Sequence, residues 1–128
     1  MTFEQDKEIT PVVFRAERSG PFKGDVTAVF PTDAADINGY QMGCYAHVGQ
    51  HSACSRQWYW TTRAATPAEY ASLKRELESA PYGYRLKVYK RITRAHDDAR
   101  RETARQYRLE ATPDYLKPLV TPKRSVGG

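Results

Sequence analysis

The sequence lacks the features that membrane-spanning, exported and nucleotide-hydrolysing proteins require. Only a few apolar residues follow one another at any point in the 128-residue chain, so we expect no membrane span. The charged first ten residues do not resemble a signal peptide, and we expect a cytoplasmic protein whose two cysteines stay reduced. No internal repeat is visible. The glycine-containing segment 19–24 fits neither phosphate-binding loop, which removes the support for nucleotide hydrolysis or dinucleotide binding.

Basic charge, by contrast, is abundant and concentrated. The formal net charge is +5 and the isoelectric point is about 9.3. Between Arg85 and Arg108 nine basic residues meet three acidic ones, so this segment accounts for the net charge of the whole chain. Such a distribution favours an acidic macromolecule as partner, either nucleic acid or a host protein complex.

Alternating and β-branched residues predict an antiparallel sheet of four to five strands. Residues 11–15 and 25–30 are expected to pair as a hairpin, and 40–48 to form a third strand. Residues 56–62 are interpreted as a fourth strand or an aromatic connection. Residues 84–92 alternate cleanly, except that Lys90 falls on the inward side near the expected strand end.

Two helices follow from different signals. Thr66, Pro67 and Glu69 form a start signal for a helix that runs to about residue 79 and covers the sheet. Residues 93–110 favour a second, basic helix with a thin apolar stripe, for which we expect weak attachment to the core. That stripe consists of Ala95, Ala99, Tyr107 and Leu109.

Together these elements predict an α+β fold with an appended basic helix and an extended tail. We expect a flexible N-terminus over 1–10, an α+β core domain over 11–93, the basic helix over 94–110 and a proline-rich tail over 111–128. The oligomeric state does not follow from the sequence.

The outward face of the 84–92 strand continues into the basic helix and forms the predicted binding surface. A tyrosine in its middle offers stacking in addition to charge, while a solvated or aggregation-resistant strand face is the competing interpretation. The residues predicted to contact nucleic acid or another acidic partner are Arg85, Lys87, Tyr89, Arg91, Arg94, Arg100, Arg101, Arg105 and Arg108.

Both cysteines and two of the three histidines lie at the spacing C-x2-H-x3-H-x2-C, in Cys44, His47, His51 and Cys54. Thiolate and imidazole are zinc ligands, so a structural or hydrolytic zinc site is one interpretation, although the two ligand pairs are unusually close in sequence. A second is a cysteine nucleophile activated by a histidine. A third is a buried, inert Cys44 with histidines that face solvent or bond locally. Strand alternation places Cys44 and His47 on opposite faces, which argues against joint ligation.

Four segments resemble a family of small uncharacterised proteins of bacterial genomes, plasmids and phages. They are the strand ending in A-V-F-P at 28–31, the Y-A-H-V-G-Q-H-S segment at 45–52, the A-T-P-A-E-Y helix start at 65–70 and G-Y-R-L-K-V at 83–88. The resemblance implies an accessory of a mobile element, a class whose small basic proteins often bind nucleic acid or a host nucleoprotein. It rests on the histidines rather than the cysteines.

The sequence therefore predicts a non-enzymatic binding protein without a cofactor. Inhibition of a host defence complex would fit this prediction. A zinc- or thiol-dependent module centred on the Cys/His cluster is the alternative. A polar turn site formed by His47, Gln50 and His51 is a third candidate, without an identified ligand.

Overall fold

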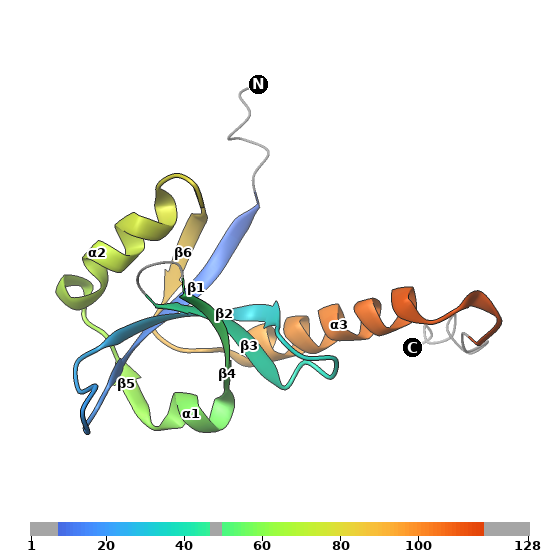
Figure 1. The fold of residues 1–128 in the computed structure, drawn as a ribbon, viewed down its shortest axis with the longest axis horizontal. Helices are drawn as coiled ribbons and strands as arrows, with labels where there is room; N and C mark the ends of the chain where they lie inside the picture. Colours follow the sequence, from blue (N-terminus) through green and yellow to red (C-terminus); the bar gives the residue numbers. More distant parts are fainter. Residues whose placement is uncertain (1–7, 47–49, 117–128) are drawn as a thin grey trace.

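The computed structural model describes residues 8–46 and 50–116 and confirms an α+β fold (Figure 1). Within these ranges, none of the helices combines the length and apolar character that crossing a membrane requires. The elements in chain order are β1 (Ile9–Glu17), β2 (Val26–Ala34), β3 (Gln41–Ala46), β4 (Gln50–Ser55), α1 (Arg56–Trp60), β5 (Thr62–Ala64), α2 (Pro67–Glu78), β6 (Arg85–Tyr89), α3 (Arg94–Ala111) and the 3₁₀ turn η2 (Asp114–Leu116).

The predicted hairpin is the centre of the sheet. Strand β1 pairs antiparallel with β2, with Phe14 opposite Ala28, and the strand order is β4-β3-β2-β1-β5. The N-terminal half of β1 also pairs with β6, which runs parallel to it, from Ile9 opposite Arg85 to Val13 opposite Tyr89. This parallel edge differs from the purely antiparallel sheet that we expected. It arises because the crossover through α2 returns the chain in the direction of β1.

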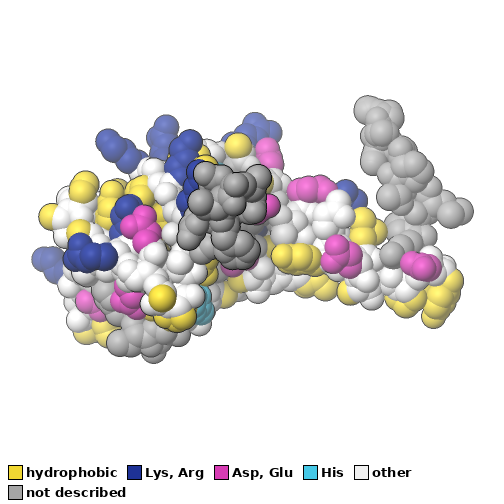
Figure 2. Space-filling model, turned by 90° about the horizontal axis from the view of Figure 1, so that it is seen from above, with side chains coloured by type: hydrophobic (Ala, Val, Ile, Leu, Met, Phe, Trp, Pro, Cys, Tyr) yellow, Lys and Arg dark blue, Asp and Glu magenta, His cyan; other side chains and the backbone are white. Residues whose placement is uncertain are grey.

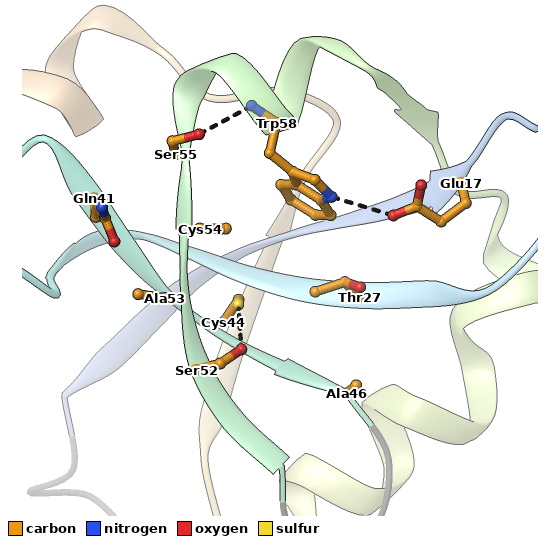
Figure 3. A pocket seen from close by; sticks show the side chains of 10 residues that line it. All are labelled: Glu17, Thr27, Gln41, Cys44, Ala46, Ser52, Ala53, Cys54, Ser55 and Trp58. Atoms are coloured by element: carbon orange, nitrogen blue, oxygen red, sulfur yellow. Dashed lines mark hydrogen bonds between the residues drawn. The ribbon is translucent and has the colours of Figure 1, made fainter. Parts of the chain in front are cut away.

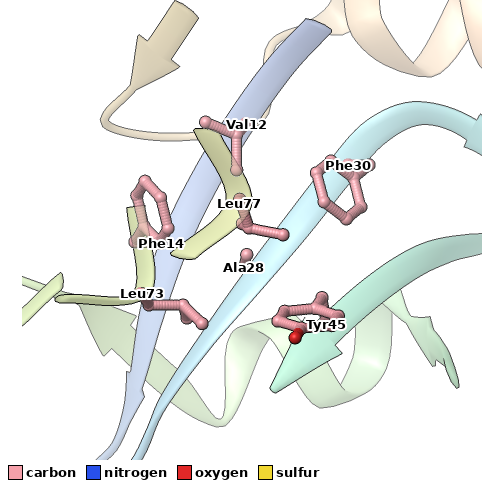
Figure 4. Packing of buried hydrophobic residues seen from close by; sticks show 7 residues of the cluster. All are labelled: Val12, Phe14, Ala28, Phe30, Tyr45, Leu73 and Leu77. Atoms are coloured by element: carbon pink, nitrogen blue, oxygen red, sulfur yellow. The ribbon is translucent and has the colours of Figure 1, made fainter. Parts of the chain in front are cut away.

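Both faces of the sheet are buried, each by a different helix. One cluster packs α2 onto the sheet (Figure 4) and consists of Val12, Phe14, Ala28, Phe30, Tyr45, Leu73 and Leu77. The opposite cluster includes a side chain from α1 and one from just before α3, and consists of Val13, Val29, Met42, Cys44, Cys54, Tyr59 and Ile92. Successive strand residues point to opposite faces, so β1 and β2 supply both clusters.

Two elements after β3 differ from the predictions. The strand β4, which begins at Gln50, was not predicted. Residues 56–60 form the short helix α1 rather than a strand, because the Ser55 hydroxyl accepts a hydrogen bond from the Trp58 amide and caps the first turn. Trp58 is half-buried, whereas Trp60 is 66% exposed, so the two tryptophans do not share one buried face.

One boundary of the predicted division lies within the described residues at the N-terminal side. Strand β1 already begins at Ile9, so the last two residues of the predicted flexible N-terminus belong to the sheet. Residues 1–7 and the tail beyond 116 lie outside the described residues.

Capping boxes begin both long helices. In α2 the Thr66 side chain accepts from the Glu69 amide and the Glu69 carboxylate accepts from the Thr66 amide, as the sequence predicts. In α3 Thr93 takes the same role and His96 takes the place of the usual Glu or Gln. The Nδ1 atom of His96 accepts the Thr93 amide hydrogen at 3.1 Å. The imidazole must be neutral to accept this bond.

A buried arginine, rather than an apolar stripe, attaches α3 to the sheet. The buried residues of α3 are His96, Arg100 and Ala104, so the predicted stripe was assigned to the wrong face. The Arg100 side chain is 1% exposed and donates hydrogen bonds to the carbonyls of Gly39 (2.8 Å) and Pro31 (2.7 Å) and to the Asp97 carboxylate (2.6 Å). Arg100 is therefore a structural residue, and its prediction as a surface contact is corrected.

Gly39, whose carbonyl accepts a hydrogen bond from Arg100, has a second role at this contact. Gly39 has φ +75°, and a Cβ atom there would lie 3.1 Å from the Cβ of Ala104. The position thus requires glycine both for its backbone conformation and for the close approach of α3.

Replacing Arg100 by alanine is expected to lower the free energy of unfolding by about 3–5 kcal/mol, because Asp97 and two buried carbonyls lose their charged partner. The exposed neighbour Arg101 provides the control. Arg101→Ala should change the stability by less than about 0.5 kcal/mol. Urea unfolding of the two variants measures both values, and equal effects would contradict the proposed attachment.

Acidification is expected to destabilise the protein through His96. Burial lowers the pKa of His96 below its ordinary 6.5; the nearby Asp97 opposes this shift and Arg100 adds to it. Below about pH 6.5 the unfolded chain binds this proton more readily than the folded chain, so stability falls as the pH drops toward the folded pKa. His96→Gln keeps an acceptor for the Thr93 amide without titrating. Between pH 7.5 and 5.5 the thermal stability of this variant should fall less than that of the native protein. Parallel pH profiles of the two proteins would contradict the proposed effect of His96.

Candidate functional site

Five exposed cations lie where strand β6 leads into α3. We name this surface the basic junction, and it consists of Arg85, Lys87, Lys90, Arg91 and Arg94. The sequence has no carboxylate between Glu78 and Asp97. Lys and Arg side chains also gather along one edge of the face drawn in Figure 2. The junction is therefore the part of the basic segment in which positive charge is not diluted by acidic neighbours.

The carboxylate that follows the basic junction is neutralised from inside the protein. Asp97 lies in the first turn of α3, where its charge would offset the junction. One of its oxygens accepts from Arg100 at 2.6 Å and the other lies 3.4 Å from Nη2 of Arg56. Among the described residues, Lys87, Lys90, Arg91 and Arg94 form no ion pair with a carboxylate. Their charges remain available to an external ligand.

Tyr89 is held within the fold rather than presented as a stacking platform. Its ring lies edge-on to the His96 imidazole, with 4.5 Å between ring centroids. The ammonium group of Lys87 lies 5.3 Å from the centre of the same ring. Because Tyr89 is half-buried and packs with the second core cluster, it positions the junction more than it extends its contact surface.

The remaining predicted cations lie further along α3, where acidic residues balance their positive charge. Between residues 95 and 111 four arginines meet four carboxylates. Arg105 makes a two-pronged contact with Glu102, at 3.0 and 2.8 Å, and Arg108 donates to the carbonyl of Ile37 at 2.7 Å. Arg101, Arg105 and Arg108 all border an open groove of about 610 Å³ that Asp98 and Glu102 also line. This half of the helix, which extends away from the sheet in Figure 1, is not a uniformly positive surface.

Lys90 is the member of the junction that sequence reasoning missed. The alternation placed it on the inward side, but β6 ends at Tyr89, so the pattern does not extend to position 90. For the same reason Ile92 packs into the cluster opposite α2 rather than with Leu86 and Val88. The charged residue at the inward position 90, which breaks the alternation, was the sequence signal that the strand ends at Tyr89 and that Lys90 is exposed.

The candidate polar turn site is only partly described. His47 lies outside the described residues, and Gln50 is placed only as the first residue of β4. His51 is exposed, and its ring centroid lies 4.6 Å from that of Tyr45 and 5.5 Å from that of Tyr82. It borders an open pocket of about 310 Å³ together with Asp33. Partial desolvation raises the pKa of Asp33, and the charge of His51 opposes that rise.

The described members of the Cys/His tetrad do not converge. Cys44 pairs with Ser52 and Met42 with Cys54 across β3 and β4, so the two cysteines face the same side of the sheet. His51 pairs with Tyr45 and faces the other side. Within residues 8–46 and 50–116 no three His, Cys, Asp or Glu side chains are grouped to hold a metal ion. The same separation removes His51 as a base for either cysteine.

Comparisons with known proteins returned no relatives. No protein-family model matches the chain, and no match was found among curated proteins or solved structures. The geometry and charge of the described residues are therefore the basis on which a function is inferred.

Proposed function

We propose that this protein binds nucleic acid through the basic junction and acts without catalysing a reaction. The observation that carries the proposal is the cluster of five exposed cations in a stretch without a carboxylate. Phosphate groups are the dominant anions of nucleic acids, and their neutralisation by Lys and Arg supplies most sequence-independent affinity.

The composition of the junction favours phosphate as the ligand. Three of the five cations are arginines, whose planar guanidinium group donates two parallel hydrogen bonds to one phosphate. Arg94 is also the first residue of α3, where the amide groups of the helix N-terminus add partial positive charge. Because Arg56 and Arg100 neutralise Asp97, the Asp97 carboxylate does not cancel the partial positive charge of the helix N-terminus.

Recognition of the backbone, rather than of bases, is the mode that the junction supports. No helix of a known base-reading motif was identified in the sequence. Tyr89 is occupied by His96 and Lys87, so stacking on bases does not add to the affinity there. The expected ligand is therefore any accessible phosphate backbone. A role as a mobile-element accessory that contacts a host nucleoprotein or defence complex is compatible with such binding.

The purified protein is expected to bind a labelled DNA duplex at low ionic strength, with an affinity that falls steeply as salt increases. Five phosphate contacts predict a loss of about 10²–10³-fold between about 50 and 200 mM salt. Fluorescence anisotropy titrations across this range measure the slope. Absence of binding to duplex DNA and to single-stranded RNA at low salt would contradict the proposal and leave an acidic protein as the partner to search for.

Two double variants with equal charge loss locate the surface. Arg91→Ala/Arg94→Ala removes two cations of the junction, and we expect it to reduce the salt slope by about 2 and to weaken binding at every salt concentration. Arg101→Ala/Arg105→Ala removes two cations from the balanced half of α3 and should leave the slope nearly unchanged. Equal losses in the two variants would show that net charge, not the junction, determines binding.

A further inference from the structure

The two cysteines lie next to each other although ten residues separate them in sequence. They occupy diagonal positions on β3 and β4, face the same side, and belong to one buried cluster. Both are free thiols. The exposed fractions are 5% for Cys44 and 8% for Cys54, so neither thiol is freely exposed on the surface.

A pocket of about 440 Å³ gives access to this pair (Figure 3). Its wall includes the indole of Trp58, whose Nε1 donates to the Glu17 carboxylate at 3.2 Å. Cys44 and Cys54 both line the pocket, and the Sγ atom of Cys44 lies 3.2 Å from Oγ of the exposed Ser52. A small polar molecule that enters the pocket therefore meets sulfur atoms rather than only apolar side chains.

The surroundings give the two sulfur atoms unequal proton affinity. The pKa of the Cys44 thiol is lowered to about 6, and the main cause is a hydrogen bond from Cys54. Burial raises this pKa, whereas hydrogen bonds with Ser52 lower it further. The hydrogen bond between the two cysteines, together with burial, raises the pKa of Cys54. At neutral pH the pair then holds one proton, with thiolate at Cys44 and thiol at Cys54. The thiolate is the nucleophilic form of cysteine.

We propose that this pair is a modification site for small hydroperoxides, with Cys44 as the attacking residue and Cys54 as the resolving residue. The Cys44 thiolate attacks the O–O bond of hydrogen peroxide, forms a sulfenic acid and, after proton transfer, releases one water molecule. The Cys54 sulfur then attacks the sulfenic sulfur, loses its proton and displaces a second water molecule. Two thiols are thus oxidised to one disulfide while the peroxide is reduced to water.

The placement of β4 permits the second step. A disulfide requires its two Cα atoms to lie closer than diagonal neighbours in an antiparallel pair usually lie. Strand β4 pairs only with β3 in the described sheet and is its edge strand, so a shift toward β3 breaks no ladder on its other side. The two cysteines already face the same side of the sheet and line the same pocket, so the movement brings together groups that share one environment.

Labelling of the native protein with a thiol alkylator, followed by peptide mapping, tests whether Cys44 and Cys54 differ in reactivity. This experiment requires no substitution. Cys44 is expected to react at least about tenfold faster than Cys54 at neutral pH, because only Cys44 is substantially ionised. Its rate should follow an apparent pKa near 6. Ser52→Ala should raise that apparent pKa. Equal labelling of the two cysteines, or faster labelling of Cys54, would overturn the proposal.

Treatment with hydrogen peroxide tests the two steps separately. Intact mass of the native protein should show the loss of two hydrogen atoms, reversed by a reducing agent. Cys54→Ser should instead accumulate a sulfenic acid at Cys44 that a dimedone probe traps, and Cys44→Ser should give neither product. Circular dichroism confirms that both variants are folded. Failure of the native protein to form the disulfide, while Cys44 labels normally, would overturn the resolving role of Cys54.

Discussion

The attachment of α3 to the sheet depends on one buried guanidinium group. Arg100 reaches from α3 to the carbonyl of Pro31 in β2 and to that of Gly39 in the following loop, and it pairs with Asp97 on its own helix. A planar group with five donors can satisfy backbone carbonyls at the end of a sheet and a carboxylate together, which no apolar side chain can do. A largely polar helix is thereby fixed to a small domain without a broad apolar face.

This attachment also decides where positive charge is exposed. Arg100 and Arg56 share Asp97 and neutralise it, so the carboxylate that follows the basic junction does not offset the exposed cations of the junction. The outer part of α3, in contrast, balances its own charges through contacts such as Arg105 with Glu102. A segment with a net positive charge thus becomes, in three dimensions, a basic junction followed by a nearly neutral extension.

A sheet that is covered on both faces separates the Cys/His segment into two environments. Cys44 and Cys54 join the cluster beneath α1, and His51 joins the aromatic group of Tyr45 and Tyr82 on the side of α2. What the linear spacing presents as one ligand set is therefore a dithiol on one side and an exposed imidazole on the other. The distinction follows from the two-residue period of a strand, which the hairpin between β3 and β4 imposes on both halves.

Local signals in the sequence by themselves determined the elements whose stabilisation is local. The hairpin of β1 and β2, the capping box of Thr66 and Glu69 and the extent of α3 were predicted because neighbouring residues make the necessary bonds or pack in a regular period. Only the tertiary structure decided that β6 pairs in parallel with β1, that α3 docks through Arg100, and that Lys90 belongs to the candidate site. Each of these depends on atoms distant in sequence: carbonyl groups sixty or more residues away from Arg100 set its role, and no composition or period encodes such a partner.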